Sequence, residues 1–122
     1  VNIFSLIEIS KNTTLNSKDI EMIEEYDISI PEIKVNINNF LLTLNSCFNL
    51  LRDSEKIAIK VYIKIGHYEI IDNQKYTIIV IEFIGEISDN IDIDKLEKQA
   101  LKSHINIYYQ SGNIKLKFPM IL

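Results

Sequence analysis

The chain has 122 residues, 47% of them hydrophobic and 25% charged, which is enough for one domain with a modest core. Thirteen basic and seventeen acidic side chains leave a net charge of −4, so the chain lacks the positive field that holds a nucleic-acid backbone. All the basic residues except Arg52 are lysines, which removes most of the planar groups that read phosphates and bases. The single cysteine, Cys47, excludes an intramolecular disulfide and a zinc site made of several thiolates.

Length and patterning also bound the location and organisation of the chain. No apolar run approaches the ~18 residues of a membrane span, and the first residues do not form a signal peptide. We therefore expect a cytoplasmic protein that binds neither membranes nor nucleic acid. The glycines and prolines are widely separated, which predicts one domain over residues 1–122. Because the first residue is Val1 and not Met, we expect that an upstream segment is missing.

The first two elements are a short helix and an edge strand. Residues 3–10 predict a helix, although their isoleucines would also suit a strand. Residues 20–30 end in an alternation that includes Ile28 and Ile30 and stops at Pro31. Because proline cannot donate a ladder hydrogen bond, this segment is predicted to lie at the edge of a sheet.

The clearest element is a helix that starts after Asn36. Apolar residues recur every three or four positions for four turns, and Asn36 suits the N-cap, while Arg52 suits the C-terminal end of the dipole. The predicted apolar face consists of Ile37, Phe40, Leu41, Leu44, Cys47, Phe48 and Leu51.

Two strands follow this helix. Residues 56–65 alternate, so their apolar side chains up to Ile65 face one way and three lysines face water. After a polar connection around Asn73, residues 76–84 are apolar on both faces, which predicts the central strand of the sheet. The three lysines are Lys56, Lys60 and Lys64.

The last elements are a helix and a hairpin. Asp92 suits the N-cap of a helix that continues through Ser103 and includes Leu101 in its apolar stripe. Residues 105–110 and 113–122 predict two strands joined by a tight turn at Gly112. The predicted fold class is therefore α+β, a two-layer sandwich in which helices cover one face of a mostly antiparallel mixed sheet.

Few residues in this chain could carry chemistry. His67 and His104 have no spacing that joins them to a catalytic or metal-binding group, and Cys47 falls on the apolar face of a helix. No phosphate loop, nucleophile elbow or paired-histidine motif occurs. We therefore predict no catalytic residue, no metal-binding residue and no cofactor.

Residues 36–122 resemble the ATP-binding domain of histidine kinases, the GHKL fold. In that family a helix with an Asn-x-x-x-Asn box precedes a hairpin, a glycine-containing loop, a lid, a helix and two final strands. Asn45 and Asn49 lie at the spacing of that box, and the resemblance implies that they are vestigial magnesium ligands. Residues 76–87 are similar to the strand that enters the first glycine box, and residues 105–119 are similar to the closing hairpin.

The departures from the family concern the nucleotide. In ATP-binding relatives the Asp of a D-x-G-x-G sequence receives the adenine amino group, whereas the aligned residues here are Glu82, Ile84 and Glu86, with Gly85 displaced by one position. Branched Ile84 would fill the space that glycine leaves open, and Glu86 would bring negative charge toward a polyphosphate. No glycine occurs between Gly85 and Gly112, so the glycine-rich lid is missing. This degenerate glycine box predicts that the domain does not bind ATP.

A kinase-like domain without nucleotide resembles the second domain of ChpT-type histidine phosphotransferases. In these proteins a helical hairpin carries the phosphoryl-accepting His, and the degenerate ATPase-like domain helps to dock a response-regulator receiver. The resemblance implies the same role here, with the hairpin and its His upstream of Val1. Lysines on the open face of residues 56–65 would contribute to docking the acidic receiver.

Two other functions fit the sequence. One is a weakly active ATP-dependent kinase domain that uses Asn45 and Asn49, with Glu82 as the adenine-binding carboxylate. The other is an unrelated α+β interaction or assembly module without catalytic activity, whose sheet edge pairs with another chain, as in a homodimer.

Overall fold

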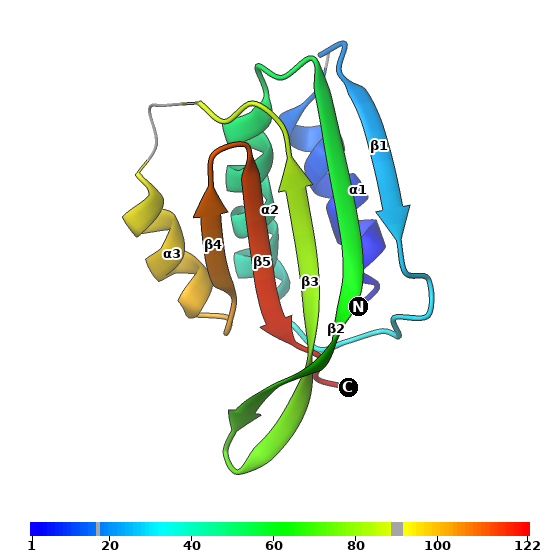
Figure 1. The fold of residues 1–122 in the computed structure, drawn as a ribbon, viewed down its shortest axis with the longest axis vertical. Coiled ribbons are helices and arrows are strands. Elements are labelled where there is room, and N and C mark those ends of the chain that lie inside the picture. Colours follow the sequence, from blue (N-terminus) through cyan, green and yellow to red (C-terminus); the bar gives the residue numbers. More distant parts are fainter. Residues whose placement is uncertain (17, 89–91) are drawn as a thin grey trace.

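A five-stranded mixed sheet and three helices form two layers (Figure 1). The computed structural model describes residues 1–16, 18–88 and 92–122. Helices α1 and α2 lie behind the sheet in the view of Figure 1, and α3 lies beside α2 and β4. No helix in the described part of the chain is long and apolar enough to cross a membrane. The elements are α1 (Ile3–Thr14), β1 (Glu21–Tyr26), α2 (Ile37–Leu51), β2 (Lys56–Ile71), β3 (Gln74–Ile84), α3 (Ile93–Leu101), β4 (Asn106–Gln110) and β5 (Asn113–Pro119).

The strand order β1-β2-β3-β5-β4 confirms the predicted fold class and element order. The pair β1–β2 is parallel and the other three pairs are antiparallel, so the sheet is mixed and mostly antiparallel. β3 is the central strand and β1 is an edge strand, both as predicted. The caps predicted from sequence also form, since Asn36 accepts a hydrogen bond from the amide of Asn39 and Asp92 accepts one from the amide of Lys95.

The N-terminal elements differ from prediction in their bounds. The first element is a helix, not the alternative strand, and it continues beyond residue 10 to Thr14. β1 ends at Tyr26 and not at Pro31. The carboxylate of Asp27 accepts hydrogen bonds from the amide and hydroxyl of Ser29, which turns the chain out of the sheet. Ile28 is therefore 89% exposed and the alternation predicted there is wrong.

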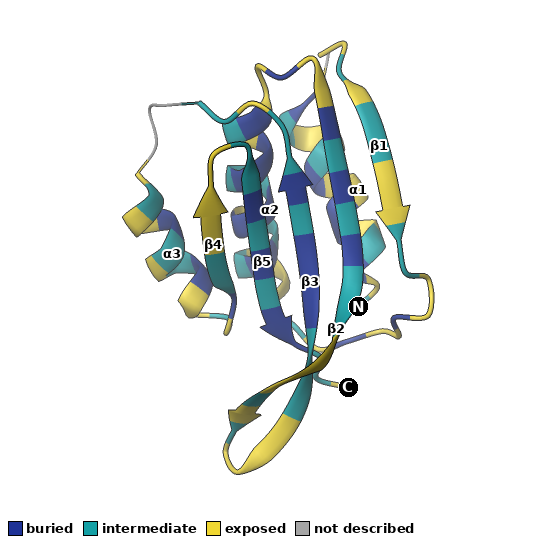
Figure 2. Cartoon of the chain, in the orientation of Figure 1, coloured by how far each residue is buried: buried dark blue, intermediate teal, exposed yellow. Residues whose placement is uncertain are grey.

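The hairpin of β2 and β3 is longer than predicted and extends beyond the other strands as an arm (Figure 1). The pairing register shifts between Lys64 and Tyr68, where Gly66 adopts a φ of 82° that favours glycine. This bulge places Ile65 outside the core with 91% of its surface exposed, so the prediction that it faces inward is wrong. Most of the arm is exposed (Figure 2).

Two apolar predictions and two predicted bounds near element ends are also wrong. Ile37 and Leu101 are exposed, although both were assigned to apolar helix faces, because each lies in a terminal turn. α3 ends at Leu101 and not at Ser103, and His104 then adopts a left-handed φ of 59°. β5 ends at Pro119, which removes a ladder donor, three residues before the predicted end.

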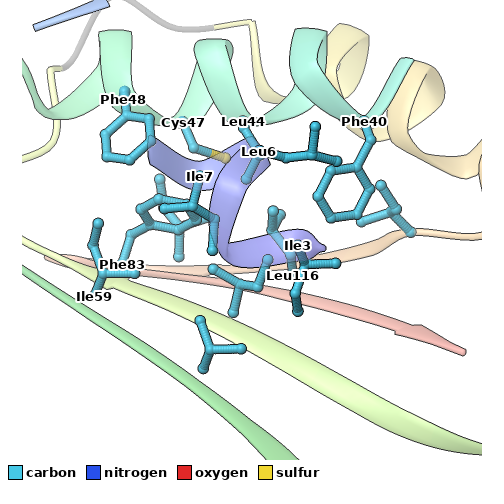
Figure 3. Packing of buried hydrophobic residues seen from close by; sticks show 14 of the residues in the cluster. Ile3, Leu6, Ile7, Phe40, Leu44, Cys47, Phe48, Ile59, Phe83 and Leu116 are labelled. Carbon is cyan, nitrogen blue, oxygen red and sulfur yellow. The ribbon is translucent and has the colours of Figure 1, made fainter. Parts of the chain in front are cut away.

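The core lies between α2 and the sheet, with α1 beside them (Figure 3). Phe48 of α2 meets Phe83 of β3 edge to face, with ring centroids 5.3 Å apart. Phe40 meets Phe118 in the same way at 5.2 Å. Such pairs add to the area buried by each ring, so these two contacts fix α2 along the sheet. Cys47 lies between them on α2 with no exposed surface, as predicted.

The buried thiol makes stability depend on alkaline pH. Burial raises the pKa of Cys47 to about 12, whereas an exposed cysteine ionises near ~8.5. The unfolded chain therefore releases this proton first, and the free energy of unfolding falls as pH rises above ~8.5. At neutral pH, Cys47→Ala should lower the free energy of unfolding because it leaves a small cavity. In urea unfolding near pH ~10, the difference in this free energy between wild type and variant should be smaller by about 2 kcal/mol, because only the wild type loses stability through the thiol. A difference independent of pH would contradict this burial.

Candidate functional site

The two asparagines of the predicted box have different surroundings on α2. The side-chain oxygen of Asn45 accepts a hydrogen bond of 2.5 Å from the hydroxyl of Ser10, so it joins α2 to α1. Asn49 is exposed and lines a groove between α2 and α3. The spacing of four residues brings both amides to one side of α2, but Asn45 is already engaged within the fold.

The groove between α2 and α3 has a volume of about 360 Å³ and continues into a second hollow of about 630 Å³ through shared lining residues. Its chemistry is mixed, with apolar Leu50 and Leu96 beside the charged groups of Asp92 and Lys95. Asn39 crosses from α2 to α3, because its amide nitrogen donates to the Gln99 carbonyl at 3.1 Å and to the Ser103 hydroxyl at 2.6 Å. The remaining lining residues of the first part are Ser46, Asn49 and Gln99.

Glu82 does not face this groove. The pleat of β3 directs Ile81 and Phe83 into the core, so Glu82 lies on the opposite, open face of the sheet. There its carboxylate accepts a hydrogen bond of 2.6 Å from the side-chain amide of Asn113. Ile84 shares that face by the same alternation, so its branched side chain does not point toward the groove between α2 and α3.

Gly85 lies where the end of β3 meets the end of α2. A β-carbon at this position would come within 2.9 Å of the Ser54 hydroxyl and 3.2 Å of a Leu51 methyl group. The absence of a side chain is therefore required by packing inside the protein. In the family, the glycines of this box let the backbone approach the nucleotide, whereas Gly85 leaves room for the side chains of Ser54 and Leu51.

The segment after Gly85 is bound to its neighbours by backbone hydrogen bonds. The amide of Gly85 donates to the carbonyl of Gly112 at 3.1 Å, and the amide of Ser88 donates to the carbonyl of Leu50 at 3.0 Å. Between them, the amide of Glu86 donates to the Ser54 hydroxyl at 2.8 Å. Residues 85–88 are thus bound to the turn between β4 and β5, to Ser54 and to the last turn of α2.

The predicted loss of a lid falls partly on residues outside the described part of the chain. Six residues, 87–92, separate Glu86 from α3, and residues 89–91 are not described. The Glu86 side chain itself is exposed. Among the described residues, no three side chains of His, Cys, Asp and Glu form a metal-binding group. His67 lies exposed on the β2–β3 arm and His104 lies exposed after α3.

Sequence reasoning missed Asn39 and Ser54, which carry the polar contacts at the two ends of this region. Neither belongs to a motif, and their partners lie 64 and 32 residues away. Gly85 was noticed for its position in the family pattern, whereas its packing role depends on a contact that sequence does not display. Ser54 stands two residues before β2, and nothing in the local sequence indicates that its hydroxyl bonds to Glu86.

Comparison with known proteins identifies the fold. No profile of a known protein family matches the chain, and no curated protein sequence matches it. The structure is similar to two nucleotide-free crystal forms of the catalytic domain of histidine kinase ThkA, with TM-scores of 0.62 and 0.64 and 12% sequence identity in each. Each match covers 99% of this chain and 94% of the compared chain. The chain therefore has the fold of a histidine kinase catalytic domain, and at this identity the likeness establishes the fold alone.

The side chains do not fit a nucleotide in the manner that the resemblance would require. The aligned carboxylate, Glu82, lies on the far face of the sheet, and Ser54 and Leu51 occupy the position that a side chain at Gly85 would take. Asn49 alone of the aligned residues faces the groove between α2 and α3 with its side chain exposed. Asn49 is a neutral amide, so none of the aligned residues that face the groove offers a carboxylate to an adenine amino group.

The contact at Gly85 can be tested by substitution. Gly85→Ala should lower the free energy of unfolding by ~1–3 kcal/mol, because the new methyl group overpacks against Ser54 and Leu51. In a Ser54→Ala background the same substitution should cost ~1 kcal/mol less, since the hydroxyl at 2.9 Å is gone. Urea unfolding of the four proteins measures this coupling.

Gly66→Ala is the matched control. A β-carbon there meets no atom within 4 Å, but the φ of +82° strains an alanine. Its cost should therefore not change when Ser54 is replaced. Equal costs of Gly85→Ala with and without the Ser54 hydroxyl would show that the contact is not the reason for the glycine.

Proposed function

We propose that this chain is a protein-recognition domain of a two-component phosphorelay that does not bind ATP and docks a response-regulator receiver. The fold of a histidine kinase catalytic domain supports a place in such signalling. The placement of Glu82 and the packing of Gly85 support a domain that has kept this fold without its nucleotide. The phosphoryl-accepting His would belong to another part of the relay.

The observation that carries the proposal is the position of Glu82. A carboxylate that selects adenine must lie beside the base, within hydrogen-bonding distance. Here the carboxylate is on the sheet face opposite α2 and α3 and is already bonded to Asn113. No rotation of this side chain alone takes it through the central strand of the sheet.

A weakly active kinase domain remains the competing function, because the groove beside Asn49 is open. The two functions differ in their response to nucleotide. A ligand present at about 100 times its dissociation constant stabilises the folded state by ~2.7 kcal/mol, which is several degrees in melting temperature for a chain of this size.

Titration with Mg-ATP separates these functions. Millimolar Mg-ATP should leave the melting temperature unchanged and give no calorimetric binding heat, because the groove does not recognise adenine or wrap the phosphates. A nucleotide-binding histidine kinase domain in the same buffer is the positive control. Saturable micromolar binding that Glu82→Gln abolishes would establish the kinase function and reject the proposal.

Receiver docking is tested with the full chain and purified receiver domains encoded in the same genome. The proposal predicts that at least one receiver binds with a saturable, micromolar dissociation constant, while unrelated acidic proteins of equal net charge do not. Sedimentation of the chain alone gives the alternative outcome. A tight homodimer that binds no receiver would favour an assembly module instead.

A further inference from the structure

The open face of the sheet is more basic than the rest of the molecule. Although the chain carries a net charge of −4, the pairing register and the pleat place five of its lysines on this face together with three glutamates. The lysines are Lys56, Lys60, Lys64, Lys115 and Lys117, and the glutamates are Glu21, Glu25 and Glu82. The chain therefore separates its charges, and its negative excess lies elsewhere.

One part of this face pairs its charges across the strands. Glu82 on β3 stands between Lys60 on β2 and Lys115 on β5, and Glu25 on β1 stands opposite Lys60. Opposite charges at directly paired positions stabilise a sheet modestly. This row is balanced by its own residues and offers little free charge to a partner.

The next part of the face, toward the β2–β3 arm, is not balanced. Lys64 pairs with Ile78, and Lys117 pairs with Val80, so neither lysine stands directly opposite an acid. Within the described residues, the ion pairs involve Lys11 and neither of these two lysines. The register places Lys64 and Lys117 on opposite sides of β3, two residues apart along that strand, and the neighbouring Lys117 ammonium lowers the pKa of Lys64. Two like charges are thus held close together without an internal counter-ion.

Aromatic and apolar groups surround this pair of charges. The ammonium of Lys117 lies 4.2 Å from the ring centroid of Tyr108, which is 51% exposed. Val80 is fully buried although it lies on the open face, and Tyr62 pairs with it from β2. Tyrosine rings around a buried apolar floor are typical of the centre of a protein interface.

We propose that the surface formed by Tyr62, Lys64, Tyr108 and Lys117 is a docking site for a protein partner that presents clustered carboxylates. This inference rests on the proposed function, because it names the surface through which an acidic receiver would dock. Carboxylates of a partner would supply the missing counter-ions, and the tyrosines would pack against its apolar atoms. A protein fits better than a nucleic acid, since three glutamates share this face and would repel a continuous phosphate backbone.

Paired charge variants test the surface. Lys64→Gln combined with Lys117→Gln should weaken receiver binding at least tenfold, whereas Lys95→Gln with Lys98→Gln, which removes the same charge from α3, should change it less than twofold. The first variant should change the melting temperature little, because the loss of the like-charge repulsion offsets the loss of the contact between Lys117 and the Tyr108 ring. A receiver that binds both variants equally well would overturn the docking site and leave the proposed function standing.

A polyglutamate peptide provides a readout that does not depend on a receiver. Amide chemical shifts of the full chain in low salt should change around Lys64 and Lys117 when the peptide is added, and high salt should reverse the change. If no receiver binds but these shifts occur and vanish in the double variant, the proposed function fails and the docking site stands. If no receiver binds and the peptide leaves these shifts unchanged, both the proposed function and the docking site are rejected. Tighter binding of a single-stranded oligonucleotide than of polyglutamate would overturn the assignment to a protein.

Discussion

The junction between the end of α2 and the end of β3 is the contact on which the rest of the structure depends. Phe48 and Phe83 set the distance between the helix and the sheet, and Gly85 then allows the chain to pass against Leu51 and Ser54. The Ser54 hydroxyl also accepts a hydrogen bond from the backbone amide of Glu86 and donates one to the Glu86 carbonyl. The junction is thus closed by packing and by hydrogen bonding together.

The two sides of the sheet present surfaces with different chemistry. Between α2 and α3 lies an open, mixed groove in which Asn39 ties the helices together. On the opposite face of the sheet lie Glu82 and most of the paired charges. The carboxylate of Glu82 therefore lies on the side of the sheet that a ligand in the groove cannot reach. Five lysines lie on that same open face, where a partner protein can contact them.

Much of the fold could be predicted because it depends on local rules. Neighbouring residues in the sequence are enough to predict the helical period of α2, the alternation of β2 and the two apolar faces of β3. The same holds for the helix caps Asn36 and Asp92. The errors occur where local pattern and tertiary context disagree. Ile65 continues an alternation but follows the strand into a bulge that leaves the core. Composition could not reveal this, because a bulge depends on the partner strand.

The candidate site was less predictable for the same reason. The motif spacing located Asn45 and Asn49 on one side of a helix, but the hydrogen bond from Ser10 that engages Asn45 joins residues 35 positions apart. Glu82 was assigned by alignment to an adenine, whereas the pleat of β3 determines which face it occupies. The direction of that side chain follows from register, which depends on both flanking strands.

Paramagnetic broadening by manganese-ATP shows whether a nucleotide occupies the groove beside the junction of α2 and β3. Manganese replaces magnesium on the nucleotide, so any bound nucleotide would place the metal near the asparagines of α2 and selectively broaden the side-chain amide signals of Asn45 and Asn49. We expect these signals to broaden no more than those of the exposed side-chain amides of Asn73 and Gln74 on the β2–β3 arm. Selective, saturable loss of the Asn49 signal, reversed by excess magnesium-ATP, would contradict this expectation.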